Sequence, residues 1–234
     1  MNILTIFIFI LVIVLIYVVY KLMTKTTTNV SGFSDASKSL SVPCAKFGLS
    51  QNYGYSVWIY VDSWQNTASG TDFKKNILTR CNGTTGPVFN LYLDNAQNNL
   101  KLQMSNNTDK ICDIKNIKLQ KWVNITMSVY GNTVDLYLDG KLVRTCVLIK
   151  LPTTPTSEDT LFVGGATSKC TTQDGDLHGY ISNVVYKSDY FTPEEAWDIY
   201  SAGYSGAGMF DFVNRYKLNF SVIKDDQTLG QVTI

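Results

Sequence analysis

The feature that most constrains the fold of this chain is a succession of short segments in which apolar and polar residues alternate. Within residues 122–130 every second position is apolar, and these positions are Val123, Ile125, Met127 and Val129. A period of two places them on one face of a β-strand. Two more alternating segments, 133–138 and 141–149, are separated by Asp139-Gly140. Because a two-residue hairpin turn needs positive φ, which this dipeptide tolerates, the pattern predicts a hairpin in an antiparallel sheet.

The composition agrees with a chain built mainly from strands. Glutamate occurs only three times in 234 residues, whereas Tyr, Val, Thr, Gly and Asn are frequent. The first three residue types favour half-buried strands, and the last two favour turns. One short helix is predicted after residue 192, because Thr192 and Glu195 can form a capping box around Pro193, with Gly203 placed to end it. The chain is therefore predicted to be an all-β antiparallel sandwich, or jelly roll.

An unbroken apolar run, Ile3–Tyr20, stands at the N-terminus. Crossing roughly 30 Å of hydrocarbon takes about 20 apolar helical residues, so the run predicts a single-pass transmembrane helix. A cleaved signal peptide is the alternative, but no basic residue precedes the run and no Ala-x-Ala-like cleavage site follows it. The residues assigned to the membrane anchor are Ile3, Phe7, Leu11, Leu15, Tyr17, Tyr20 and Lys21.

The basic residues near this run predict its orientation. Four lysines lie on its C-terminal side, namely Lys21, Lys25, Lys38 and Lys46. The positive-inside rule then places the following domain on the cytosolic face. The predicted organisation is a transmembrane anchor at 1–22, a polar stalk at 23–41, the jelly-roll domain at 42–203, and a C-terminal extension with closing strands at 204–234.

Two features point to the opposite side of the membrane. Five glycosylation sequons begin at Asn29, Asn82, Asn106, Asn124 and Asn219, although about three are expected by chance in a chain so rich in Asn, Ser and Thr. Five cysteines occur, at Cys44, Cys81, Cys112, Cys146 and Cys170. The odd number leaves at least one unpaired within the monomer, and no spacing is typical of zinc. Buried thiols acting as small apolar side chains remain an open alternative to disulfides.

Several segments occur in an order that resembles a known family. They are YSVWIYVDSW, NILTRCNG, FNLYLDNAQNNLKLQMS, LQKWVNITMSVYGNTVDLYLDGKLV, LFVGG and LHGYISNVVYKSDYFTPEEAWDIYSAG. Together they look like the landmarks of laminin-G-like and pentraxin-related domains in the concanavalin A-like lectin/glucanase superfamily. The resemblance covers residues 42–203 and implies a double sheet of about twelve to fourteen strands.

The residues give no support to catalysis. Glycosidases of this superfamily carry a strand motif of the form Glu-x-Asp-x-Glu, whereas no glutamate lies on a predicted strand here. Asp135 and Asp139 are four residues apart, but Asp139 belongs to a turn. His178 is the single histidine and has no matched nucleophile for a triad. We therefore predict no enzymatic activity, no catalytic residues and no cofactor.

Two short acidic loops resemble the calcium-binding loops of lectins. They contain Asp94 with Asn95, and Asp174 with Asp176. Carboxylate and amide oxygens suit calcium, but short Asp/Asn/Gly loops are more often plain turns. No metal site is predicted, and calcium at these loops is left open.

The tryptophans are candidates for stacking on sugars. Trp58 and Trp122 are embedded in alternating segments and are expected in the core. Trp64 lies beside a polar loop and is the candidate for an exposed carbohydrate platform.

Two functions follow from these expectations. An anchored, cytosol-facing, non-catalytic jelly roll resembles the membrane-anchored minor capsid proteins of large icosahedral DNA viruses. That resemblance implies a structural protein of the virion, held in the internal viral membrane, that tethers major and other minor capsid proteins to the bilayer. The alternative is a surface-exposed carbohydrate-binding or adhesion protein, favoured by the sequons and cysteines. A net charge of +1 argues against nucleic acid as a partner.

Overall fold

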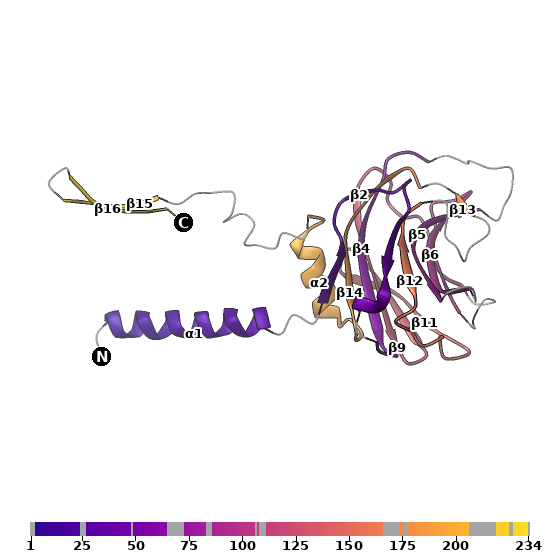
Figure 1. Ribbon diagram of the computed structural model, residues 1–234, viewed down its shortest axis with the longest axis horizontal. Coiled ribbons are helices and arrows are strands. Elements are labelled where there is room, and N and C mark those ends of the chain that lie inside the picture. Colours follow the sequence, from indigo (N-terminus) through magenta and orange to yellow (C-terminus); the bar gives the residue numbers. More distant parts are fainter. Residues whose placement is uncertain are drawn as a thin grey trace.

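Two β-sheets pack face to face in this chain as a sandwich (Figure 1). The structure is a computed structural model, and it describes residues 3–23, 27–47, 49–64, 73–82, 86–105, 107, 111–165, 174–175, 177–205, 219–224 and 227–233. Each sheet has seven strands within these residues, which confirms the predicted all-β sandwich.

The first sheet is antiparallel throughout and contains the predicted hairpin. Its strands follow the order β1 (Thr27–Ser31), β14 (Gly179–Lys187), β4 (Tyr53–Val61), β9 (Trp122–Tyr130), β10 (Thr133–Leu138) and β11 (Lys141–Val147), with β2 (Ser34–Asp35) also paired to β14.

The second sheet faces the first across the core. Its strands follow the order β3 (Leu40–Pro43), β12 (Thr160–Val163), β5 (Lys74–Asn82), β6 (Gly86–Asp94), β7 (Leu100–Met104) and β8 (Ile111–Ile114). The short strand β13 (Asp174–Gly175) pairs with β5 in parallel.

The turn between β10 and β11 has the geometry that the sequence predicts. Asp139 and Gly140 have φ angles of 50° and 73°, the left-handed values that a primed two-residue hairpin turn requires. The Asp139 carboxylate also accepts a hydrogen bond from the backbone N–H of Asn124 (3.1 Å). The turn is therefore held by β9 as well as by its own conformation.

The core lies between the sheets, and strand alternation supplies it. On β4 the inward side chains are Tyr53, Tyr55, Val57, Ile59 and Val61. Each inward residue faces its counterparts on the second sheet, including Phe89 and Leu91 of β6. Full burial of such a side chain contributes about 1.5–3 kcal/mol relative to leaving it exposed.

A buried ion pair interrupts this apolar core. Arg80 of β5 and Asp159, just before β12, both have fully buried side chains, and the Arg80 Nε atom lies 2.7 Å from Asp159 Oδ2. Arg80 Nη1 also donates to the Tyr55 hydroxyl (2.9 Å), and Nη2 donates to the Thr156 carbonyl (3.1 Å). Every nitrogen of the guanidinium therefore has an acceptor, which is the condition under which a buried charge is tolerated.

Two neighbouring tyrosines on β4 offer a matched test of buried hydroxyl groups. Both are almost fully buried, but the Tyr53 hydroxyl has no hydrogen-bond partner in the described part of the chain. We expect Tyr53→Phe to leave the free energy of unfolding unchanged or raise it by up to about 1 kcal/mol. Tyr55→Phe removes a hydrogen-bond acceptor of Arg80 and is expected to lower the free energy of unfolding by about 1–3 kcal/mol. Urea denaturation of the two variants measures the difference, and equal losses would contradict the assignment.

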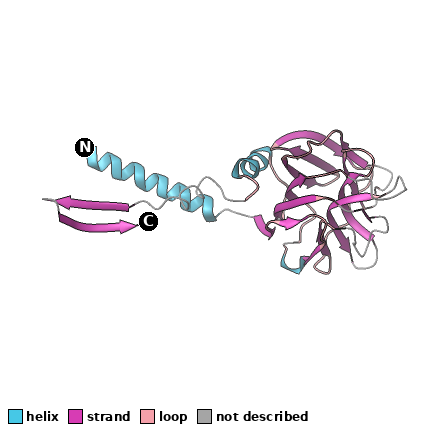
Figure 2. Cartoon of the chain, turned by 90° about the horizontal axis from the view of Figure 1, so that it is seen from above, coloured by secondary structure: helices cyan, strands magenta, loops and turns pink. Residues whose placement is uncertain are grey.

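The predicted helix forms over Pro193–Ala202 as α2. Thr192 and Glu195 make the reciprocal hydrogen bonds of a capping box, and the backbone N–H of Gly203 donates to the Tyr200 carbonyl at the other end. Ser128 of β9 fastens the chain entering the helix, because its hydroxyl donates to the Phe191 carbonyl (3.0 Å) and accepts from the Phe191 N–H (2.8 Å). The helix is thus held on the outer face of the first sheet (Figure 2).

The segment predicted as a polar stalk differs in the structure. Part of residues 23–41 forms strands β1 and β2, which pair with β14, and the start of β3, which pairs with β12. The segment TTNVS lacks an apolar alternation because β1 is an edge strand whose side chains are half-buried or exposed. The sandwich therefore begins at residue 27 and not at residue 42.

The two ends of the chain form elements of their own. Helix α1 spans Ile3–Met23, and its described side chains, which include Phe7, Leu11, Leu15 and Tyr17, are exposed. Within the described residues, no helix meets the length and apolarity needed to cross a membrane. At the C-terminus β15 (Asn219–Lys224) and β16 (Gln227–Thr233) pair with each other, whereas the prediction assigned this extension to strands that close the sandwich.

Four of the five cysteines lie in the described part of the chain, and Cys170 lies outside it. A disulfide joins Cys112 of β8 to Cys146 of β11, and Cys81 is also disulfide-bonded. Cys44 is a buried free thiol, and burial raises its pKa to about 11. Such a thiol stays protonated at neutral pH and is a poor nucleophile, so Cys44 acts as a small core side chain.

Candidate functional site

Aromatic side chains gather on the outer face of the first sheet, opposite the core. Alternation places Trp58 and Tyr60 of β4 on this face, because Val57 and Ile59 point inward. Trp122 of β9 and Tyr180 of β14 pair with Tyr60 across the strands and lie beside it. We call this set, together with Phe33, the aromatic face.

Apart from the buried Trp58, the rings of the aromatic face pack against one another while keeping part of their surface in solvent. Phe33 stacks on Tyr180 with ring centroids 5.1 Å apart and meets the edge of Trp122 at 6.2 Å. Tyr60 lies 5.6 Å from Trp122. Phe33 and Tyr180 nevertheless remain 65% and 42% exposed. Large exposed aromatic groups held rigidly by their neighbours are typical of a binding surface.

The end of helix α2 adds a ring to this face. Gly203 has a φ of 83°, a left-handed value that glycine adopts without steric cost, and the chain then leaves the helix toward the sheet. The Tyr204 carbonyl accepts a hydrogen bond from the Ser182 hydroxyl (2.8 Å). The Tyr204 ring stacks on Trp122 with centroids 4.6 Å apart and an interplanar angle of 1°.

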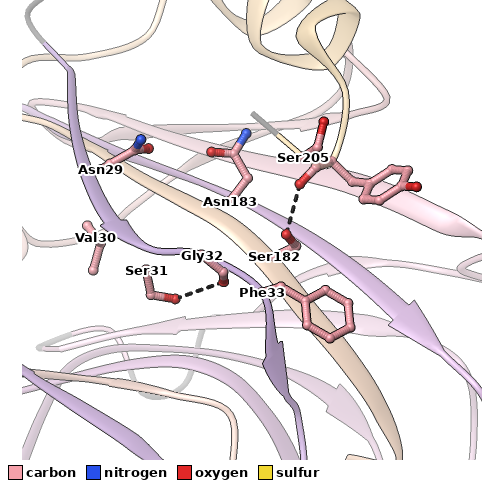
Figure 3. A pocket seen from close by; sticks show the side chains of 9 residues that line it. Asn29, Val30, Ser31, Gly32, Phe33, Ser182, Asn183 and Ser205 are labelled. Atoms are coloured by element: carbon pink, nitrogen blue, oxygen red, sulfur yellow. Dashed lines mark hydrogen bonds between the residues drawn. The ribbon is translucent and has the colours of Figure 1, made fainter. Parts of the chain in front are cut away.

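A pocket of about 470 Å³ opens beside these rings (Figure 3). It is lined by Asn29, Val30, Ser31, Gly32, Phe33, Ser182, Asn183, Tyr204 and Ser205. These residues come from β1, the turn that follows it, β14 and the chain after α2. The pocket therefore joins segments that are about 150 residues apart in sequence.

Two β-bulges on neighbouring strands shape this pocket. The register of β1 against β14 shifts between Asn29 and Ser31, and that of β14 against β4 shifts between Ser182 and Val185. Asn183, within the second bulge, has a φ of 47°. Bulges re-aim side chains and often occur next to functional sites. Here both lie at the same place along paired strands and turn polar side chains toward the pocket.

The polar groups of the pocket are amides and hydroxyls. Asn29 is exposed, and the Asn183 amide donates weakly to the Gly203 carbonyl (3.4 Å). Ser31 donates to the adjacent Gly32 carbonyl (3.3 Å). Among the nine lining residues none is acidic or basic. The pocket thus offers uncharged hydrogen-bonding groups beside aromatic rings.

Trp64, the predicted carbohydrate platform, lies at the second sheet and outside this pocket. Its ring is half-buried against the core, and its indole N–H donates to the Asn95 carbonyl (3.2 Å). The Lys75 ammonium lies 4.8 Å from the ring centroid and donates to the Asn95 side chain (2.8 Å). Trp64 is therefore already engaged by neighbouring protein groups in this structure.

The two acidic loops considered for calcium make different contacts with the rest of the chain. Asp94 forms an ion pair with Lys101 (2.5 Å), and its other carboxylate oxygen accepts from the Ala96 N–H (3.3 Å). Asp174 pairs through its backbone with Lys74, while Asp176 is outside the described residues. Within the described part of the chain, no three His, Cys, Asp or Glu side chains are grouped as a metal site would need.

The remaining candidates for acid–base chemistry, Asp135, Asp139 and His178, each contact different groups. Asp135 accepts from the Thr145 hydroxyl (2.6 Å), and Asp139 binds Lys118 (3.0 Å). His178 precedes Gly179, and its carbonyl accepts from the Asp62 N–H (3.0 Å). The structure brings none of these three side chains into the pocket.

Sequence reasoning missed this pocket because its parts looked unrelated. The sequence predicts Phe33 in the stalk and Trp58 and Trp122 in the core. Trp58 is indeed buried, but beneath α2 on the outer face, and Trp122 is only half-buried. A usable signal was present, since Trp58, Tyr60, Trp122 and Tyr180 all occupy outward positions of their strands. Outward positions of a one-sided sheet are normally polar.

Comparison with known proteins agrees with this architecture. Residues 34–196 match the family described as the concanavalin A-like lectin/glucanases superfamily. The match covers more than half of the chain, and the chain therefore belongs to this superfamily. No curated protein sequence matches it.

Solved structures share the fold at low sequence identity. The CBM40 module of a Ruminococcus gnavus sialidase, bound to α2,3-sialyllactose, has a TM-score of 0.53 and 15% identity, covering 74% of this chain and 99% of the module. The receptor-binding domain of botulinum neurotoxin D has a TM-score of 0.54 and 15% identity over 74% of this chain and 44% of its own. A Trypanosoma rangeli sialidase mutant has a TM-score of 0.54 and 13% identity, covering 76% of this chain and 28% of the sialidase. The chain thus spans a minor part of the last two.

Proposed function

We propose that this chain is a carbohydrate-binding protein and that its aromatic face and adjoining pocket form the binding site. The observation that carries the proposal is the pairing of exposed, rigidly held rings with a pocket of uncharged hydrogen-bonding groups. Sugars present an apolar face of C–H groups and a rim of hydroxyls. Aromatic rings match the first, and amide and hydroxyl groups match the second.

The fold supports this proposal without settling it. A carbohydrate-binding module and a receptor-binding domain have the same architecture as this chain. A shared fold does not by itself transfer a ligand, because function depends on the local site. The proposal therefore stands on the surface described above.

The direct test measures glycan binding by the purified protein, first on a glycan array and then by calorimetry. Phe33→Ala removes the most exposed ring of the aromatic face and is expected to weaken binding by about tenfold or more, as truncation of an interface aromatic anchor does. Tyr130→Ala is the matched control, because Tyr130 is also an exposed ring packed on another ring, Tyr190, but does not line the pocket. Equal effects of the two variants, or no glycan bound at all, would contradict the proposal.

Anchoring of a viral capsid shell to an internal membrane is a second proposal for the same chain. The observation that favours it is helix α1, whose described side chains are apolar and exposed. Apolar side chains along a helix with no packing partner favour a lipid environment. In this proposal the sandwich docks on capsid proteins from the cytosolic side.

Glycosylation in microsomes distinguishes the two proposals. Asn29 is exposed, whereas the Asn124 side chain is fully buried and its amide donates to the Ser56 hydroxyl (3.1 Å). If the domain enters the lumen, we expect Asn29→Gln to remove one glycan from the protein and Asn124→Gln to remove none. An unglycosylated, protease-accessible domain would favour the capsid tether.

A further inference from the structure

A second pocket, of about 340 Å³, lies between helix α2 and the turn that joins β10 to β11. Its lining includes Asn116, Lys118, Asp139, Lys141, Trp197 and Tyr200. Trp197 is 47% exposed, and its ring lies 5.4 Å from that of Tyr200. Like the first pocket, this one combines exposed aromatic surface with polar groups.

A continuous series of rings connects the two pockets. Tyr204 lines the first pocket, and Tyr200 and Trp197 line the second. Trp58 lies between them: its ring stacks on Tyr200 (5.7 Å, 17°) and meets the edge of Tyr204 (6.4 Å). Trp58 is itself buried, and its contacts with both tyrosine rings keep Tyr200 and Tyr204 close to each other.

The ring series is longer than a single sugar needs. A sugar ring is similar in size to an aromatic ring, whereas exposed rings lie at both pockets: Phe33 (65% exposed) and Tyr204 (47%) at the first, and Trp197 (47%) at the second. The buried Trp58 connects these two groups beneath the surface, through Tyr204 and Tyr200. The rings of the second pocket are also fixed in place, because Trp197 and Tyr200 pack on the Asp139-Gly140 turn. A Cβ added at Gly140 would lie 3.0 Å from both side chains. A preorganised surface of this kind binds without the entropy cost of ordering it.

The charges of the two pockets differ. The first is lined by uncharged residues, so a carboxylate or sulfate placed there would lose its hydration without gaining an opposite charge. The second contains the Lys118–Asp139 ion pair (3.0 Å) and Lys141, which has no ion-pair partner among the described residues. Only the second pocket therefore suits an acidic substituent.

We infer that the ligand of this site is an oligosaccharide that spans both pockets, with uncharged sugar units in the pocket beside Phe33. This inference rests on the proposed carbohydrate-binding function and makes it more specific. It predicts that affinity depends on chain length, which a site for a single terminal sugar would not show.

The test is calorimetric titration with two neutral series, cello-oligosaccharides and chito-oligosaccharides, from the mono- to the hexasaccharide. We expect the affinity of at least one series to rise with length. Trp197→Ala should then weaken hexasaccharide binding by about tenfold and leave monosaccharide binding unchanged. Phe33→Ala should weaken both, and Trp197→Phe should restore most of the length dependence.

The outcomes separate the inference from the proposed function. The inference is overturned if the affinity does not rise with length beyond the monosaccharide, or if the Trp197→Ala variant binds the hexasaccharide as tightly as the native protein does. Either outcome leaves the proposed carbohydrate binding intact. Binding of sialylated glycans that Phe33→Ala abolishes, with no neutral glycan bound, also overturns it. No binding of any glycan by the folded protein removes the proposed function itself. Thermal unfolding of each variant confirms that it is folded.

Discussion

Replacing Asp159 by asparagine is expected to lower the free energy of unfolding by about 3–5 kcal/mol. The Asp159 carboxylate is fully buried and neutralises Arg80, which is also fully buried. It accepts two further hydrogen bonds from Thr156, one from the backbone N–H (2.9 Å) and one from the hydroxyl (2.6 Å). The substitution leaves a guanidinium charge in the core without a counter-charge. Since domains of this size are stable by only about 5–15 kcal/mol, the loss is a large fraction of the total.

A double-mutant cycle checks the physical reason for this effect. Arg80→Met alone should also destabilise the protein, because it leaves the carboxylate buried and unpaired. The Arg80→Met/Asp159→Asn variant should lose much less than the sum of the two single variants. Urea denaturation at neutral pH gives the three free energies, with the slope m confirming that the same surface is exposed. Additive losses would show that the two charges do not stabilise each other.

Loss of the Cys112–Cys146 disulfide is the second large effect that we expect. The bond joins residues 34 positions apart and links β8 and β11, the edge strands of opposite sheets. In the chain-entropy account, a cross-link that closes a loop of this length stabilises the fold by about 4 kcal/mol. The Asp113–Arg144 ion pair beside it (3.4 Å) is half-exposed and contributes little, about 0–1 kcal/mol. The covalent bond is therefore expected to contribute more than this ion pair.

The double variant Cys112→Ser/Cys146→Ser should unfold at a correspondingly lower urea concentration than the oxidised protein. Adding a reductant should shift the native protein toward the variant. Any further shift that the reductant causes in the variant itself reports the second disulfide, at Cys81. A variant as stable as the oxidised protein would show that the bond does not constrain the unfolded chain.

Local signals explain the parts of the fold that the sequence predicts well. Asp139-Gly140 indicates its turn through the positive φ that both residues tolerate, and Thr192 with Glu195 indicates a helix start within the four consecutive residues 192–195. Both signals can be recognised from a few adjacent residues, although Asn124 of β9 also holds the folded turn. The order of alternating segments extends these local signals to the whole sandwich.

The candidate site depends on pairing between distant segments, which local patterns do not contain. The pocket exists because a shift near Val30 in β1 meets another near Asn183 in β14. The buried pair of Arg80 and Asp159 likewise joins residues 79 positions apart. The edge strand β1 carries no clear alternation, and its sequence, like that around Phe33, therefore predicts a stalk. The transmembrane and capsid expectations remain predictions that the experiments above decide.

The short connection between α1 and β1 has a mechanical consequence. Helix α1 ends at Met23 and β1 begins at Thr27, so any tension on the helix is transmitted to the sandwich through β1. As an edge strand, β1 has β14 as its one hydrogen-bonded neighbour in the described part of the sheet, and we expect it to separate from the sheet before the inner strands do when force is applied. The same strand forms one wall of the pocket, and β14 forms the other. If a ligand bridges the two walls, as proposed above, it would reinforce the strand that carries the load, and tension on the helix would in turn weaken ligand binding.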